Sequence, residues 1–158
     1  MHTPMGSFSD SPGAIYPALR RLEKDGLIRG QVQDGSGRRK KIFRLTASGA
    51  AAFKHWLNQP VTHDDVVHGI DELMLRFSFM EQGIGEEAAV RFLKSLQTQL
   101  QAYIPSLREF LIAHQGDMPR SGRLALDSGA RGYETLLEWS KDAIASYEGE
   151  SKEGGEQS

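Results

Sequence analysis

The sequence predicts a mainly α-helical protein that contains one small β-hairpin. Two short helical segments flank a hairpin pattern within the first 60 residues, and leucine-rich stripes with helical spacing fill most of the remainder. Charge divides the chain at a similar place. Residues 1–48 hold nine Lys or Arg and four Asp or Glu, a net charge of +5, whereas residues 49–158 carry −7. A basic front and an acidic rear indicate two parts with different partners, of which the first suits nucleic acid.

The first helix is predicted over residues 11–24, with Ser11 as N-cap, Pro12 at the first helical position and Gly26 just past the end. On one face lie four apolar residues: Ile15, Ala18, Leu19 and Leu22. The other face carries Tyr16, Pro17, Arg20, Arg21 and Lys24. Three cations and an aromatic ring turned away from the core suit a helix that lies in a nucleic-acid groove. The alternative is an ordinary surface helix with solvated arginines.

Residues 27–33 and 39–45 are predicted strands, joined by the turn sequence Asp-Gly-Ser-Gly at residues 34–37. Four consecutive cations follow this turn: Arg38, Arg39, Lys40 and Lys41. We expect them to contact phosphates or a minor groove, and the alternative is a charged edge that prevents sheet-to-sheet pairing. Thr46 or Ser48 caps the next helix, which ends before Pro60.

Long helices are predicted from residue 61 onward. The first carries an apolar stripe over residues 66–77, the second spans residues 86–113 with a kink at Pro105, and the third spans residues 123–147. The second has a seam of coiled-coil type, which we interpret as a dimerisation surface; the alternative is that it is core. The seam consists of Leu93, Leu96, Leu100, Ile104, Leu107 and Leu111.

Enzyme and metal chemistry have no candidate in the sequence. Cysteine is absent, and neither a P-loop nor a Gly-x-Ser-x-Gly motif occurs. His63, Asp64, Asp65 and His68 lie close together, but their spacing matches no known helical ligand pair. No run of eighteen apolar residues is present. We therefore expect no catalytic residue, no cofactor, no metal and no membrane.

Several of these segments together closely resemble the PadR family of bacterial transcriptional regulators. The resemblance rests on residues 11–28, SPGAIYPALRRLEKDGLI, on residues 37–46, GRRKKIFRLT, and on Gly49. Residues 71–77, DELMLRF, and 136–139, LLEW, are similar to its C-terminal helical domain. Helix, basic hairpin and capped helix in this order are those of a winged helix.

The resemblance implies a truncated winged helix-turn-helix at residues 1–60 and a long-helix dimerisation and effector domain at residues 61–147. A disordered tail is expected at residues 148–158, because residues 151–158 consist only of Ser, Lys, Glu, Gly and Gln. It implies a cytoplasmic homodimeric repressor that binds a palindromic operator in double-stranded DNA. Release by a small hydrophobic or aromatic effector, such as a phenolic acid, is also implied. Trp139, with Phe77, Tyr103 and Phe110, is the candidate lining of an effector pocket.

Position by position, the resemblance places Tyr16, Pro17, Arg20 and Arg21 on the recognition helix. Arg38, Arg39, Lys40 and Lys41 then lie on the wing. Lys24 is expected to contact a phosphate.

The departure from the family is at the start, where only ten residues precede the matching block. The family has a full helix and most of a second there, and these cover the apolar face of the recognition helix. Each large side chain left uncovered forfeits roughly 1.5–3 kcal/mol. We expect a clipped start; the alternative is that a dimer partner supplies the cover. A competing hypothesis is a protein–protein module that pairs with full-length relatives without binding DNA.

Overall fold

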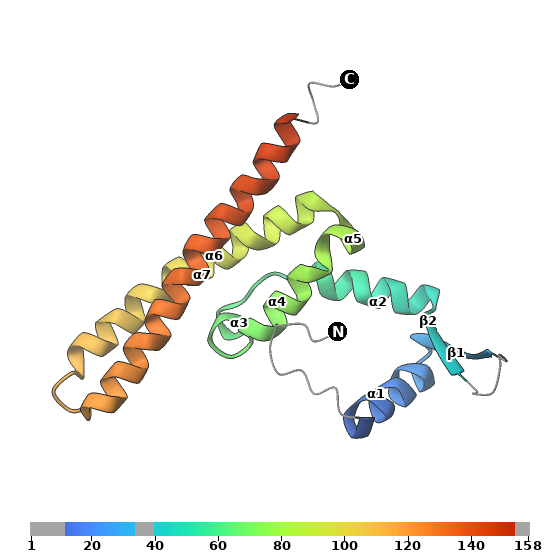
Figure 1. Cartoon of the computed structure of the whole chain (residues 1–158), viewed down its shortest axis with the longest axis horizontal. Helices are drawn as coiled ribbons and strands as arrows, with labels where there is room; N and C mark the ends of the chain where they lie inside the picture. The colour runs from blue at the N-terminus through green and yellow to red at the C-terminus, as the bar shows by residue number, and fades with distance from the viewer. Residues whose placement is uncertain (1–11, 34–39, 154–158) are drawn as a thin grey trace. The chain divides into compact units, whose positions relative to one another are not determined.

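The computed structural model describes residues 12–33 and 40–153, which fall into two compact units, residues 1–59 and residues 60–158. The predicted fold class is confirmed, since the described residues form helices, one two-stranded antiparallel hairpin and a long C-terminal helix (Figure 1). No helix among these residues is both long and apolar enough to cross a bilayer.

Unit 1 has the predicted order of elements. Helix α1 (Pro12–Lys24) is followed by strands β1 (Ile28–Gln33) and β2 (Lys40–Leu45) and by helix α2 (Ala47–Leu57). The strands pair in antiparallel register from Ile28 opposite Leu45 to Gln33 opposite Lys40. Gly26 ends α1 with a φ of +71°, as its sequence position predicts. The predicted N-cap Ser11 and the predicted turn at residues 34–37 lie outside the described residues.

Thr46 joins the end of the hairpin to the start of α2. Its side-chain oxygen accepts the Gly49 N–H at 3.0 Å, so Thr46 is the N-cap. Its hydroxyl donates to the Gly26 carbonyl at 2.6 Å, and its own N–H donates to the Leu27 carbonyl at 3.0 Å. Ser48, the alternative cap, instead donates to the Gly26 carbonyl at 3.0 Å. One threonine therefore fixes both helices and both strands at a single junction.

Unit 2 begins with three short helices, α3 (His63–His68), α4 (Ile70–Ser78) and α5 (Met80–Ile84). The single stripe predicted over residues 66–77 is therefore wrong as one helix. Apolar residues recur at helical spacing across this whole stretch, but the helix is broken at Gly69. Gly69 ends α3, and its N–H donates to the Asp65 carbonyl at 2.8 Å. A capping box between Thr62 and Asp65 begins α3.

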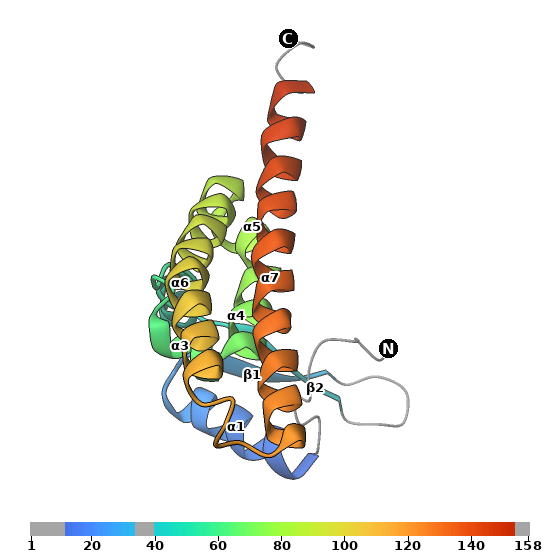
Figure 2. The ribbon, with the colours of Figure 1, turned by 90° about the vertical axis from the view of Figure 1, so that its left-hand side faces the viewer.

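Helices α6 (Glu86–Ala113) and α7 (Arg120–Glu153) form an antiparallel pair, which lies side by side in both views (Figures 1 and 2). The bounds of α6 match the prediction, and it stays one helix through Pro105. The predicted end of the last helix at residue 147 is wrong, because α7 continues to Glu153. Lys94 Nζ of α6 lies 3.6 Å from Glu148 Oε1 at the start of this extension, and Glu and Lys favour the helix. The predicted disordered tail starts too early; residues 154–158 lie outside the described residues.

The leucine seam of α6 lies in the core of unit 2. Leu93, Leu96 and Leu100 are fully buried within the chain, and Leu111 is nearly so. Ile104 and Leu107 are half-buried. This burial within one chain favours the alternative that the seam is core, and its role in dimerisation stays a prediction. The physical reason is that α6 packs simultaneously against α3, α5 and α7, which gives its apolar stripe partners within one chain.

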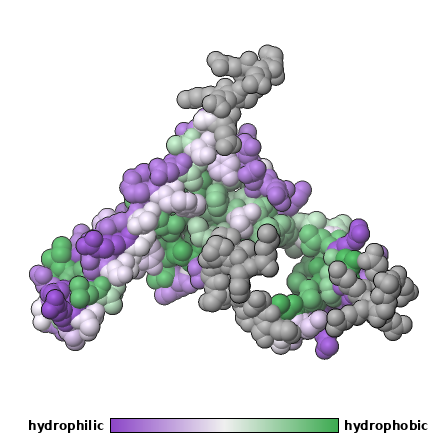
Figure 3. Space-filling view, in the orientation of Figure 1, coloured by the Kyte–Doolittle hydropathy of each residue, from purple (hydrophilic) through white to green (hydrophobic). Residues whose placement is uncertain are grey.

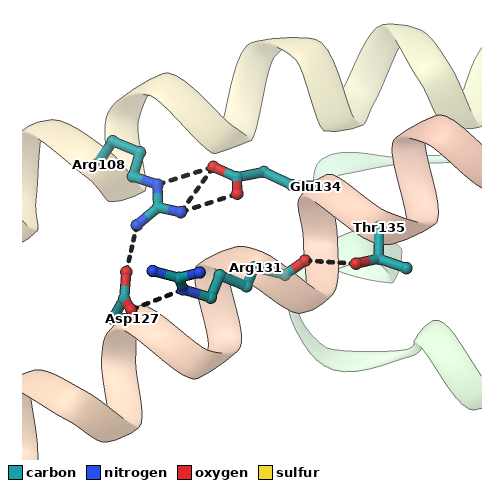
Figure 4. A network of polar contacts seen from close by, with 5 residues as sticks. All are labelled: Arg108, Asp127, Arg131, Glu134 and Thr135. Atoms are coloured by element: carbon teal, nitrogen blue, oxygen red, sulfur yellow. Dashed lines mark hydrogen bonds and ion pairs between the residues drawn. The ribbon is translucent and has the colours of Figure 1, made fainter.

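A charged network ties α6 to α7 (Figure 4). Arg108 of α6 donates through Nε and Nη2 to the two carboxylate oxygens of Glu134, each at 2.8 Å, and through Nη1 to Asp127 at 2.6 Å. Arg131 Nε donates to the other oxygen of Asp127 at 2.8 Å. The two-pronged guanidinium geometry sets the register of the helix pair. Glu134 of α7 therefore has a structural role as the partner of Arg108.

Candidate nucleic-acid interface

The outer face of α1 presents the predicted cations to solvent. Tyr16, Arg20 and Lys24 follow one another at intervals of four residues, so they form one row along the helix. Pro17 and Arg21 form the adjacent row. All five side chains are exposed, and Tyr16 is 62% exposed. The structure therefore brings together the whole predicted α1 part of the interface.

The opposite, apolar face of α1 is incompletely covered. Ile15 and Leu22 remain 40% and 39% exposed, and Leu19 is half-buried. The C-terminal end of α1 is joined to the segment that leads into β1. There the Leu27 N–H donates to the Leu22 carbonyl at 2.9 Å. Contact between α1 and β1 completes this attachment.

Only part of the predicted basic hairpin tip falls within the structure. Arg38 and Arg39 lie outside the described residues, and Lys40 is described only as the first residue of β2. Lys41 is described fully, and it is engaged inside unit 1. Its Nζ donates to Glu23 Oε2 at 2.8 Å and lies 4.8 Å from the centroid of the Phe43 ring. Lys41 is thus directed to the end of α1, a placement that its sequence position among four cations does not indicate.

A pair of arginines that we did not predict as site residues lies on the other face of the hairpin. Arg29 of β1 is directly opposite Arg44 of β2, and both are exposed. Strand residues alternate between faces, so this pair faces away from the side that holds Gly30, Lys41 and Phe43. Like charges directly opposite one another destabilise a hairpin. The antiparallel register of the two predicted strands would have shown this pair in the sequence.

Five cations on α1 and the hairpin are exposed and form no ion pair within the described residues. Within the described residues, no ion pair involves Arg20, Arg21 or Lys24 of α1, or Arg29 or Arg44 of the hairpin. Five exposed and unpaired positive charges in one small unit form a surface suited to the phosphates of a polyanion. Glu23 and Asp25 are the acidic residues in the described part of unit 1, and Glu23 is held by hydrogen bonds. Its hydrogen bonds from Lys41 and then from the Gly30 N–H hold the pKa of its carboxyl below the ordinary value, so it is ionised at neutral pH.

Unit 2 contains an apolar hollow of about 570 Å³ on one side of α7. Trp139 lines it, and Phe77 contacts Trp139 edge-to-face at 5.6 Å between ring centroids. Tyr103 packs against Tyr133, which also lines the hollow. Phe110 instead stacks on His114 at 4.2 Å. Of the four aromatic residues predicted for an effector pocket, Trp139 lines this hollow, and Phe77 and Tyr103 each contact one lining residue. The remaining lining residues are Ile70, Gly129, Gly132, Thr135 and Leu136.

The acidic and histidine cluster near residue 63 has structural roles. Asp65 accepts the Thr62 N–H at 2.8 Å in the capping box, and the His63 ring lies edge-to-face on Tyr103 at 5.3 Å. No group of three or more His, Asp or Glu residues in the described ranges could hold a metal ion.

Comparison with known proteins gives a family match for the N-terminal part of the chain. Residues 2–55 match the model of the "Transcriptional regulator PadR-like family". A Mycobacterium tuberculosis protein, "Transcriptional regulator Rv3488", is 45% identical over 42 residues, which are 27% of this chain and 39% of that protein. The chain thus matches well under half the length of this curated relative. Both are described as transcriptional regulators, a class that is not enzymatic.

Two solved structures are similar over most of the chain. The PadR-like transcriptional regulator BC1756 from Bacillus cereus is 26% identical, with a TM-score of 0.45, and the alignment covers 90% of this chain and 81% of that one. PadR from Bacillus subtilis, solved in complex with operator DNA, is 23% identical, with a TM-score of 0.41 and coverage of 88% and 80%.

Proposed function

We propose that this chain, which is PadR-like over residues 2–55, is a transcriptional regulator that binds double-stranded DNA through α1 and the β-hairpin. The observation that carries the proposal is the set of five exposed cations on α1 and the hairpin that have no ion-pair partner within the described residues. In the proposed complex, α1 enters the major groove, where Arg20 and Arg21 reach base edges or phosphates and Lys24 contacts a phosphate. Arg29 and Arg44 relieve their mutual repulsion against the DNA backbone.

The finer parts of the proposal concern assembly and control. The regulator acts in the cytoplasm as a homodimeric repressor. Its operator is palindromic, because the two identical DNA-binding surfaces of a homodimer match two identical half-sites. Apolar side chains left exposed in unit 2 support the dimer: Phe110, Ile112 and Leu124 are 47%, 68% and 55% exposed. Apolar surface is visible where α6 passes into α7, at the lower left of Figure 3. The hollow beside Trp139 supports binding of a small hydrophobic or aromatic effector.

Salt dependence of DNA binding tests the proposal. A duplex of about 30 base pairs (roughly three turns of B-DNA) is first selected from a random pool with the wild-type chain. The slope of log K against log salt is then measured for wild type and for the double variant Arg29→Gln/Arg44→Gln. Each lost phosphate contact lowers the slope by about 0.9, so the double variant should lose about 2.

The matched control is Arg91→Gln/Lys141→Gln, which removes two exposed cations from unit 2 and should leave the slope unchanged. An equal loss of slope in both double variants would contradict the assignment of the interface to unit 1. A stable dimer in sedimentation that binds no duplex at all would overturn the proposed function and favour the protein–protein module.

A further inference from the structure

Glu23 links the last turn of α1 to both strands of the hairpin. One carboxylate oxygen, Oε1, accepts the Gly30 N–H of β1 at 3.0 Å. The other, Oε2, accepts a hydrogen bond from Nζ of Lys41 in β2 at 2.8 Å. This side chain thus bridges the three elements that carry the proposed DNA-binding cations.

The backbone geometry explains why a carboxylate is needed at this place. The Thr46 N–H donates to the Leu27 carbonyl, and hydrogen-bonded pairs alternate along an antiparallel ladder. The Gly30 N–H therefore points away from β2, where the two-stranded sheet offers it no strand partner. Glu23 satisfies this donor. Glycine at residue 30 leaves room for this arrangement, because a Cβ there would lie 2.0 Å from Lys41 Cε and 2.8 Å from Glu23 Oε1, so both side chains would have to shift.

The position of Glu23 is unfavourable for a negative charge in two respects. It lies in the last turn of α1, where the helix dipole already places partial negative charge. It also lies between the exposed cations of α1 and the hairpin, where an anion opposes attraction of DNA. A carboxylate in this place needs a compensating role, and its two hydrogen bonds supply one.

We propose that Glu23 is a positioning residue that fixes the hairpin relative to α1, and that Lys41 is its partner rather than a phosphate contact. This inference rests on the proposed function. The link orients Arg29 and Arg44 relative to Arg20 and Arg21, so that all four meet one DNA duplex in a single arrangement. Lys41 neutralises Glu23 and, through its position over Phe43, keeps the carboxylate directed to the hairpin.

Two effects of Glu23→Gln have opposite signs, which makes the proposal testable. Removal of one negative charge and release of Lys41 should strengthen binding to a duplex of random sequence and steepen its salt dependence. Loss of the charged link to Lys41 loosens the hairpin, which should weaken binding to the selected duplex. We expect the ratio of selected to random affinity to fall about tenfold, a size comparable with one mismatched base pair. A purely electrostatic role for Glu23 would raise both affinities equally.

Lys41→Gln gives an independent second variant. If Lys41 only holds Glu23, the affinity ratio falls while the salt slope stays within error of wild type. If Lys41 contacts a phosphate, the slope falls by about 0.9. Glu23→Gln and Lys41→Gln combined should lower the ratio no further than either change alone. The matched control is Glu138→Gln, which removes an exposed carboxylate that pairs with Lys141 in unit 2 and should change neither quantity.

A DNA-free measurement separates failure of this inference from failure of the proposed function. In ¹⁵N-labelled wild-type chain, the Gly30 amide resonance should move as Glu23 is protonated, with a midpoint below the ordinary glutamate pKa. The Lys41→Gln variant should shift that midpoint upward. If the Gly30 amide resonance of the folded protein does not move as Glu23 is protonated, the proposed link between Glu23 and Gly30 is overturned. A wild-type chain that shows the titration but binds neither duplex overturns the proposed function, and with it the role of Glu23 in DNA binding.

Discussion

At the scale of single residues, Arg76 shows the sharpest conflict between burial and charge. It is only 5% exposed, and its Nε and Nη2 have no hydrogen-bond partner within the described residues. Its guanidinium lies 4.9 Å from the centroid of the Phe92 ring, and burial lowers its pKa from the ordinary value. Packing on an aromatic face compensates only part of the cost of such a group.

We therefore expect Arg76→Met to be as stable as wild type or more stable. Methionine keeps the packing on Phe92 and removes unsatisfied donors that cost about 1–3 kcal/mol. Arg76→Ala should be less stable than Arg76→Met by about 2–5 kcal/mol, because it leaves a cavity. Thermal unfolding followed by circular dichroism measures both. A methionine variant that unfolds well below wild type would show that the charge itself stabilises unit 2.

Two helical glycines should respond to alanine in opposite directions. At Gly49 a Cβ would lie 1.8 Å from the Leu27 carbonyl oxygen, in the junction that Thr46 closes. At Gly129, in α7, a Cβ would meet nothing within 4 Å. Gly49→Ala should thus destabilise unit 1 by about 1–3 kcal/mol or more, whereas Gly129→Ala should stabilise unit 2 by about 1 kcal/mol.

The two tryptophans separate these effects, since Trp56 reports on unit 1 and Trp139 on unit 2. The unfolding midpoint of Trp56 fluorescence in a Trp139→Phe background should fall for Gly49→Ala and stay constant for Gly129→Ala. Equal stability of Gly49→Ala and its parent would mean that α2 need not approach the Leu27 carbonyl so closely.

At the scale of elements, the α6–α7 pair depends on ionised carboxylates. Hydrogen bonds from Arg131 and then from Arg108 lower the pKa of Asp127 from its ordinary value of 3.8. A carboxyl whose pKa is lower in the folded state stabilises that state above its unfolded pKa. This contribution is lost as pH falls through the folded value. Stability of unit 2 should thus fall below about pH 4, where unfolded carboxyl groups take up protons.

Asp127→Asn should reduce this acid sensitivity, because asparagine has no proton to take up. Asp142→Asn, an exposed site on the same helix, is the control. Unfolding midpoints from Trp139 fluorescence between about pH 3 and 7, a range that spans the carboxyl pKa values, measure the dependence. The same pH profile for Asp127→Asn and wild type would place the acid sensitivity elsewhere.

Elements with strong local signals were predictable from sequence. Pro12 and Gly26 bound α1, Thr46 caps α2, and alternation defined both strands. Elements whose apolar periodicity runs on without interruption were not, because periodicity records which face is apolar and not where a helix ends. The break at Gly69 is such a case. The continuation of α7 beyond residue 147 was missed for the opposite reason, because residues 148–153 carry no apolar side chain although the helix runs on through them.

At the scale of the whole molecule, the charge asymmetry of the sequence coincides with the division into two units. Residues 1–48 carry the net positive charge, and unit 1 ends at residue 59. The five exposed cations of α1 and the hairpin belong to unit 1, whereas the arginine network and the leucine seam belong to unit 2. Proposed DNA recognition and the buried helical core are therefore carried by separate parts of the chain.

The sequence by itself determined the mainly helical class, the helix–hairpin–helix order of unit 1 and the α1 face that bears Arg20 and Arg21. These depend on spacing and capping within a few residues of chain. Tertiary structure alone decided that Lys41 pairs with Glu23, eighteen positions away, and that the leucines of α6 are covered by their own chain. The reason is that a side chain's partner depends on which distant element packs beside it, and local pattern holds no record of that packing.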